Sequence, residues 1–223
     1  MNSPANIRFI ETVKRMPLMD LPVRTTIVDL EGTRILISPG SVVSDADYRS
    51  IGEVTDIVIP NLFHTGGLGR ALLFFPKAKV WCCPGADSSK NVQPGSFTEL
   101  NAKNWPYQNK LSLHCLEGAP KINEVLFMHH DSKSLIVTDL FFNLLNARGL
   151  GSWIILHIFG TYRKFALSKF FYSYVKDKQK FMDSIKRVMS EDFSNIIVSH
   201  GDNVNGNAKN LMKKALSERG VVV

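Results

Sequence analysis

The sequence predicts an α/β protein in which two β-sheets pack face to face and helices cover their outer sides. Predicted strands come first as hairpins, and later strands are mixed with helical patterns. Of the 223 residues, 44% are hydrophobic and 21% are charged. Such a chain can bury one sizeable core, so we expect a single domain over 1–223 rather than a disordered protein.

The first element is expected to be an N-terminal arm or short helix over 1–22. A charge interrupts this segment every few residues, which excludes the apolar core of a signal peptide. Ser44 has a side chain suited to cap a helix over 45–54. The predicted strands share a compact apolar pattern and lie at 25–30, 33–38, 55–60, 77–83, 110–118, 123–130, 133–139 and 195–201.

Further helical patterns cover 68–75, 141–190 and 207–220. The stretch 86–107 is rich in Ser, Asn, Pro and Gly and predicts a loop insertion. The longest apolar stretch, 149–160, is well short of the roughly 20 residues that a bilayer-spanning helix needs. We therefore expect no transmembrane segment.

Basic charge is concentrated in one helical segment. Between Thr161 and Ser190 there are eight basic and two acidic residues, which accounts for most of the formal net charge of +7. Apolar side chains recur there at helical spacing, so the favoured interpretation is a solvated face of a helix that packs on the core. Peripheral contact with an anionic surface, between Arg163 and Arg187, is the alternative. Nucleic-acid binding is disfavoured, because the aromatic residues follow the helical core face.

Three cysteines, Cys82, Cys83 and Cys115, do not form the framework of a secreted disulfide protein. Two of them are adjacent, and the odd number leaves one unpaired. This usage favours a reduced cytoplasmic location. The paired histidines His129 and His130 precede a hairpin turn, where we expect them to face solvent.

Three apolar strands each lead into a residue that can bind a metal or transfer a proton. His64 follows the strand at 55–60, Asp139 ends the strand at 133–139, and His200 ends the strand at 195–201. Functional groups tend to gather where loops leave strand ends. Two imidazoles and one carboxylate are a ligand set that zinc, iron or manganese accepts.

These residues resemble a known family. The turn ILISPG, the window IPNLFHTGGL, the following strand FPKAKVW, the Asp139 of LIVTDLFF and the pair His200-Gly201 occur in one order along the chain. The same order is found in the metallo-β-lactamase-like superfamily, most closely in a subfamily of unknown function with a degenerate HxHxDH motif. The resemblance spans roughly 25–220 and implies a four-layer αββα sandwich.

The resemblance also implies a reduced metal site. Of the HxHxDH motif only the last histidine remains, as His64, because Ile59, Asn61 and Phe63 replace the other motif residues. The family's two-metal site is therefore expected to keep one divalent metal, held by His64, Asp139 and His200. Ser38 stands where the family often has aspartate, which removes a possible polar support.

Two interpretations of this site remain. In the first, the three residues hold one zinc, iron or manganese ion, and the chain is a hydrolase of an ester, lactone or phosphoester. Asn61 and Asp202 are then possible neighbours of the ligands, although Asn61 cannot act as a base. In the second, the site holds no metal, and the chain is a catalytically inactive relative that binds a ligand, a protein or a polyanion.

Overall fold

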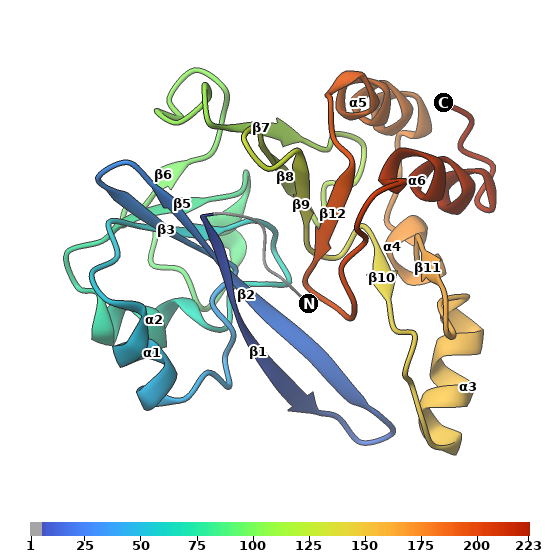
Figure 1. Ribbon diagram of the computed structural model, residues 1–223, viewed down its shortest axis with the longest axis horizontal. Coiled ribbons are helices and arrows are strands. Elements are labelled where there is room, and N and C mark those ends of the chain that lie inside the picture. Colours follow the sequence, from blue (N-terminus) through green and yellow to red (C-terminus); the bar gives the residue numbers. More distant parts are fainter. Residues whose placement is uncertain (1–5) are drawn as a thin grey trace.

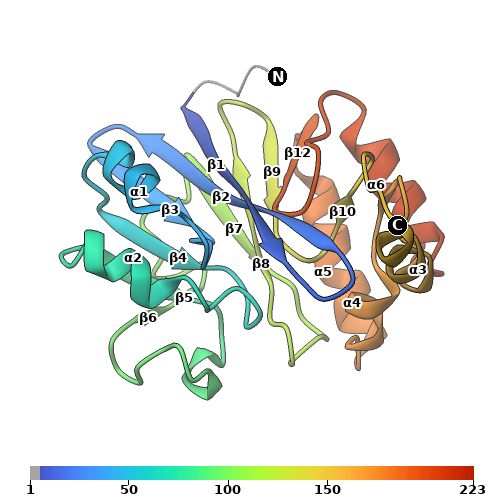
Figure 2. The same cartoon turned by 90° about the horizontal axis from the view of Figure 1, so that it is seen from below.

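The computed structural model describes residues 6–223, which form two β-sheets with helices on both outer sides (Figure 1). In Figure 2 the helices α1 and α2 lie on one side of the paired sheets, and α3 to α6 lie on the other. The expected αββα sandwich is therefore confirmed. One hydrophobic cluster joins α1, α2 and both sheets, and a second cluster joins the second sheet to the helices on its outer side.

The first sheet contains six strands in the spatial order β1-β2-β3-β4-β5-β6. Neighbours from β1 to β3 pair antiparallel, and those from β3 to β6 pair parallel. These strands are β1 (Ile7–Arg15), β2 (Asp20–Leu30), β3 (Thr33–Ile37), β4 (Asp56–Ile59), β5 (Lys79–Cys82) and β6 (Thr98–Glu99). Because β3 and β4 are parallel, their carboxyl ends deliver the following loops to the same edge.

The second sheet has four strands in the order β12-β9-β8-β7, and a separate ladder joins β10 to β11. Only β12 and β9 are parallel, so the residues that follow these two strands also meet at one edge. The strands are β7 (Leu111–Cys115), β8 (Val125–His129), β9 (Ser134–Val137), β10 (Phe142–Asn143), β11 (Phe165–Ala166) and β12 (Asn195–Val198).

Capping side chains mark the start of three of the six α-helices in the described part of the chain. Ser44 accepts a hydrogen bond from the backbone of Asp47 and caps the first helix, as predicted. The helices are α1 (Asp45–Ile51), α2 (Leu68–Phe74), α3 (Leu150–Phe159), α4 (Lys169–Ser173), α5 (Lys178–Ser190) and α6 (Ala208–Ser217), with a short 3₁₀ turn η1 (Ala86–Ser88).

Apolar residues of both sheets form the central cluster. Trp81, Phe127 and Ile57 belong to it and are almost completely buried. The outer face of the second sheet forms the other cluster with α4, α5 and α6, in which Phe171 and Phe181 are buried. Burial of this apolar area is the main favourable contribution to folding.

The prediction for 1–22 was wrong where it allowed a helix. Residues 1–5 lie outside the described part of the chain, but Ile7–Arg15 forms strand β1, which pairs along its whole length with β2. The pairing partner stabilises this strand, although few of its own side chains are buried. The expected loop at 86–107 is mostly irregular, but it contains η1 and the short strand β6.

The basic segment contains the short strand β11 and two helices, α4 and α5. Phe181, Ile185 and Val188 of α5 are buried in the outer cluster, so the apolar face of this helix packs on the core. Two basic residues of the segment form ion pairs within the protein: Lys164 with Glu218, and Arg187 with Glu117. Within residues 6–223, no helix combines the length and the apolar character needed to cross a bilayer.

The expectation that His129 faces solvent was also wrong, because its side chain is completely buried at the end of β8. The backbone N–H of Ser132 donates to His129 Nδ1, which places the imidazole hydrogen on Nε2. Burial lowers the pKa of His129 below its usual value. The hairpin turn thus folds back over the ring, which the turn sequence did not indicate.

Acidification is therefore expected to destabilise the fold through His129. In the unfolded chain His129 binds a proton near pH 6.5, whereas in the folded chain it binds one only at lower pH. The stability that neutral His129 provides is therefore complete above pH 6.5 and is lost as the pH falls below it. The loss can reach about 1.4 kcal/mol per pH unit. The free energy of unfolding, measured with urea at pH 5 to 8, should fall less steeply with decreasing pH in His129→Leu than in the wild type. Equal slopes would contradict the assignment.

Candidate metal centre

His64, Asp139 and His200 come together at the edge where the two sheets meet, and their potential ligand atoms all lie within 4.8 Å of one another. His64 follows β4, whereas Asp139 and His200 follow the parallel strands β9 and β12. His64 Nε2 lies 3.2 Å from one carboxylate oxygen of Asp139, and His200 Nε2 lies 3.2 Å from the other. The two Nε2 atoms are 3.3 Å apart.

The orientation of His200 is determined by its surroundings. Its Nδ1 lies 2.8 Å from the carbonyl oxygen of Pro22 in β2, and a carbonyl can only accept a hydrogen bond. Nδ1 therefore carries a hydrogen, and Nε2 is the ring nitrogen that faces the cluster and that the neutral tautomer would offer to a metal. The ring of Phe142 stacks on the imidazole with the centroids 4.9 Å apart.

The residue after His200 must be glycine. Gly201 has a φ of +106°, and a Cβ there would lie 2.2 Å from the carbonyl oxygen of Asn143. This close approach lets the backbone N–H of Asn143 donate to the carbonyl oxygen of His200. Gly201 thus permits the turn that holds His200 at the end of β12.

His64 is held by Ser38 and Asn61. The Ser38 hydroxyl lies 2.6 Å from His64 Nδ1, so it can accept the Nδ1 hydrogen and leave Nε2 free to bind a metal. The Asn61 side-chain oxygen accepts hydrogen bonds from the backbone N–H groups of Phe63 and His64. The expectation that Ser38 removes a polar support was therefore wrong, since its hydroxyl contacts the cluster directly.

Asp139 is an ionised carboxylate between two imidazoles. Burial acts to raise its pKa, but the nearby His64 and the hydrogen bond from His200 hold it far below its usual range. The side-chain nitrogen of Asn61 donates to Asp139 Oδ2 over 2.7 Å and to the Thr138 hydroxyl. Asn61 therefore links the loop of His64 to Asp139, across the junction of the two sheets.

Beneath the cluster lies Glu124, which is completely buried. Its carboxyl oxygens accept hydrogen bonds from the backbone N–H groups of Thr138 and Asp139, at 2.8 and 3.0 Å. Burial and the neighbouring charge of Asp139 raise the pKa of Glu124 to about 7. Glu124 orients the backbone that carries Asp139.

The donor set fits a divalent metal. Ligands at about 2.0–2.1 Å from a tetrahedral ion are separated from one another by about 3.3 Å. The distances of 3.2 and 3.3 Å among the three side chains agree with this value. Two imidazole nitrogens and one carboxylate leave a fourth position open, as is typical of catalytic rather than structural zinc sites.

Phe63, at the place of the motif aspartate, belongs to an aromatic cluster instead. Its ring lies 6.0 Å from that of Phe170 and 5.6 Å from that of Tyr174, between centroids, and 44% of the residue remains exposed. A cleft of about 430 Å³ opens between this aromatic cluster, Lys14 of β1 and the turn at Ser41, and Asp139 and His200 also line it. Seven of its seventeen lining residues have polar side chains, and we call it the polar cleft.

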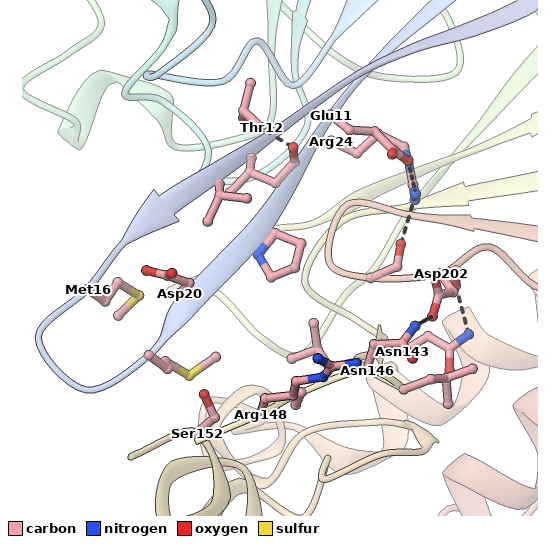
Figure 3. Close-up of a pocket in the computed structure, with 18 of the residues that line it drawn as sticks. Glu11, Thr12, Met16, Asp20, Arg24, Asn143, Asn146, Arg148, Ser152 and Asp202 are labelled. Carbon is pink, nitrogen blue, oxygen red and sulfur yellow. Dashed lines mark hydrogen bonds and ion pairs between the residues drawn. The ribbon is translucent and has the colours of Figure 1, made fainter. Parts of the chain in front are cut away.

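Asp202 lies apart from the cluster, in a separate cavity of about 630 Å³ (Figure 3). Its backbone carbonyl accepts a hydrogen bond from Asn143, and its carboxylate accepts one from Asn146. On another wall of this cavity, the buried Arg24 donates to Glu11 and to the carbonyl oxygen of Gly201. Among the contacts of the described residues, those of Asn61 reach the cluster and those of Asp202 do not.

The remaining histidines and cysteines have other surroundings. Cys82 and Cys83 are buried free thiols, and burial raises the pKa of Cys82 to about 12, so they are not reactive nucleophiles. His114 pairs with Glu191, with 2.9 Å between Nε2 and the carboxylate oxygen. His157 on α3 contacts the backbone carbonyl of Trp153 through Nδ1.

Comparison with known proteins identifies the fold. No protein-family model matches the sequence, and no curated protein matches it. A metallo-β-lactamase from Pontibacter korlensis superposes with a TM-score of 0.68 at 15% identity, over 97% of both chains. The metallo-β-lactamase FIM-1 from Pseudomonas aeruginosa, in its mono-zinc form, has a TM-score of 0.65 at 13% identity, over 99% of this chain and 95% of that one.

A flavodiiron core from Synechocystis gives a TM-score of 0.66 at 9% identity. The match covers 97% of this chain but 59% of that one. Together these similarities define the architecture: the chain has the metallo-β-lactamase-like fold. Members of this class carry different chemistries on one scaffold, so the function must be argued from the site itself.

Proposed function

We propose that the chain is a mononuclear metal-dependent hydrolase of an ester, lactone or phosphoester. His64, Asp139 and His200 would be the protein ligands of one zinc, iron or manganese ion. The observation that supports this most strongly is the geometry of His200. Its Nδ1 donates to the carbonyl oxygen of Pro22, so Nε2 is the ring atom that faces a carboxylate oxygen of Asp139, at 3.2 Å. A neutral imidazole held in this orientation offers Nε2 as a metal ligand beside a carboxylate ligand.

Each residue of the site has a role in this proposal. Asp139 remains ionised and offsets the positive charge of the ion, while Asn61 and Ser38 orient Asp139 and His64. A divalent metal with an open position supplies an acidified water at neutral pH. Lys14 and Tyr174 line the cleft, where an ammonium and a hydroxyl can bind the oxygen atoms of the substrate.

The alternative is a catalytically inactive relative that binds a ligand, a protein or a polyanion. The position of Phe63 favours it, because among the residues that line the polar cleft Asp139 is the only carboxylate. The cleft therefore lacks a second carboxylate to act as general base. Contact with an anionic surface through the segment between Arg163 and Arg187 remains part of this alternative. A cytoplasmic location, inferred from the cysteines, is proposed for either function.

The metal content of the purified protein distinguishes the hydrolase from the inactive relative. Elemental mass spectrometry of untagged protein should find about one equivalent of metal in the wild type and little in His64→Ala and His200→Ala. The matched control His157→Ala removes an exposed imidazole outside the cluster and should keep the metal. Loaded wild type should then hydrolyse members of an ester, lactone and phosphoester panel. Absence of metal after incubation with zinc, iron or manganese would exclude the hydrolase.

A further inference from the structure

The cluster of His64, Asp139 and His200 also borders an apolar cavity, which adjoins the polar cleft and shares six lining residues with it. This cavity has a volume of about 310 Å³ and reaches Asp139 and His200 at one end. Twelve of its sixteen lining residues are apolar. Eight of these twelve come from the β1–β2 hairpin, α3 and α4, and they include Met19, Leu21, Ile155, Leu156, Phe159 and Phe171.

The few polar groups of this cavity are already used or lie at its end. Ser168 caps α4, where its hydroxyl accepts a hydrogen bond from the backbone N–H of Phe171. Asp139 and His200 belong to the cluster, and Thr161 is the other polar residue of the lining. A sugar or nucleotide placed here would lose hydrogen bonds to water without replacement, whereas a hydrocarbon would lose none.

Phe63 and Phe170 line both the polar cleft and the apolar cavity, and the cluster lies at their junction. This arrangement matches an amphiphile with a polar group on one side of the reacting bond and a hydrocarbon on the other. The volume is at the lower end of the roughly 300–1,000 Å³ of known ligand sites, which suits one unbranched chain.

We propose, on the basis of the hydrolase function above, that the substrate is an acyl ester whose unbranched chain occupies the apolar cavity. The ester group then lies at His200 and Asp139, and the rest of the molecule lies in the polar cleft. Hydrolysis adds the oxygen of one water to the acyl carbon, breaks the bond to the ester oxygen, and releases a carboxylic acid and an alcohol.

Exposed apolar side chains surround this end of the molecule. Leu150 and Ile158 of α3 are 73% and 60% exposed, and Trp153 and Leu18 are also exposed. The hairpin tip and α3 lie together at the lower end of Figure 1, and a Cβ at Gly151 would lie 2.0 Å from the carbonyl oxygen of Leu18. Apolar residues of this kind are found on surfaces that contact lipid. The acyl chain can therefore come from a bilayer or from a dispersed ester.

Binding of 1-alkanols to chelator-treated protein tests the cavity without a metal. Calorimetric titration with hexanol, octanol and decanol should show affinity rising about fourfold per methylene. Ile155→Arg places a charge in the cavity and should weaken octanol binding at least tenfold. Ile158→Arg makes the same change on the exposed side of α3 and should leave it unaltered.

Alkanol affinity that does not depend on chain length, or that survives in Ile155→Arg, would overturn the acyl-chain proposal. If Ile155→Arg fails to fold, Ile155→Phe provides the second test, because the larger apolar ring should shorten the longest chain that still gains affinity. Since the protein is metal-free, a hydrolase that fails for lack of metal would still bind alkanols. The two failures are therefore distinguishable.

Vesicles of mixed phosphatidylcholine and phosphatidylserine identify the source of the chain. The protein would draw its acyl chain from a bilayer if it binds alkanols and also co-sediments with these vesicles, and if Trp153→Glu abolishes the co-sedimentation. Alkanol binding without co-sedimentation would support a dispersed acyl ester. Each result supports the acyl chain as the ligand and assigns its origin.

Discussion

Glu124→Ala is expected to lower the free energy of unfolding by about 3–5 kcal/mol. The backbone N–H groups of Thr138 and Asp139 would lose their acceptors inside the protein, at about 1–3 kcal/mol each, and a cavity would remain. Urea unfolding followed by circular dichroism measures the change. Because Asp139 is attached to the same backbone, metal binding should weaken as well.

The matched control for this prediction is Glu117→Ala. Glu117 is half-exposed and pairs with Arg187 on the surface, so its loss should change the stability by about 0.5 kcal/mol or less. A Glu124→Ala protein as stable as the Glu117→Ala protein would show that water replaces the lost acceptor. The role assigned to Glu124 would then be wrong.

Asp139→Asn is expected to reduce the affinity for zinc by more than 100-fold. This substitution keeps the shape of the side chain but removes the only negative charge between His64 and His200. Partners that merely orient a ligand contribute about 10–100-fold to metal affinity, so the loss of a ligand charge must exceed this range. Competition with a chromophoric chelator measures the dissociation constant.

Ser38→Ala provides a graded comparison for the same measurement. It removes the hydroxyl that contacts His64 Nδ1 and should weaken zinc binding about 10–100-fold. Ser41→Ala, at the wall of the polar cleft, should leave the affinity unchanged. If Asp139→Asn and Ser41→Ala bound zinc equally well, the cluster would be a hydrogen-bonded structural element.

Most of the sheet could be predicted from local patterns, because buried strands are short apolar runs with clear ends. The run at 55–60 contains β4, and Ser44 caps α1 as its side chain predicts. Strand β1 lacked such a pattern, since most of its residues are exposed and its stability comes from pairing with β2. The short strands β10 and β11 pair through two residues each and have no periodicity to detect.

The candidate site was partly visible in the sequence. Three strand ends identified His64, Asp139 and His200, because parallel neighbours deliver their following residues to one edge. The contacts of Ser38 and Glu124 join residues far apart in the chain and follow no motif. The only signal for Glu124 was its place directly before the apolar strand β8, because an ionisable residue there is rarely buried without a partner.

The division of the cluster between the two sheets has a consequence for the order of events in folding. His64 is attached to the first sheet, whereas Asp139 and His200 are attached to the second, through strands β9 and β12. An intermediate in which only one sheet has formed presents at most two of the three donors. The proposed ion would therefore bind tightly only after the two sheets have docked, and once bound it would slow their separation.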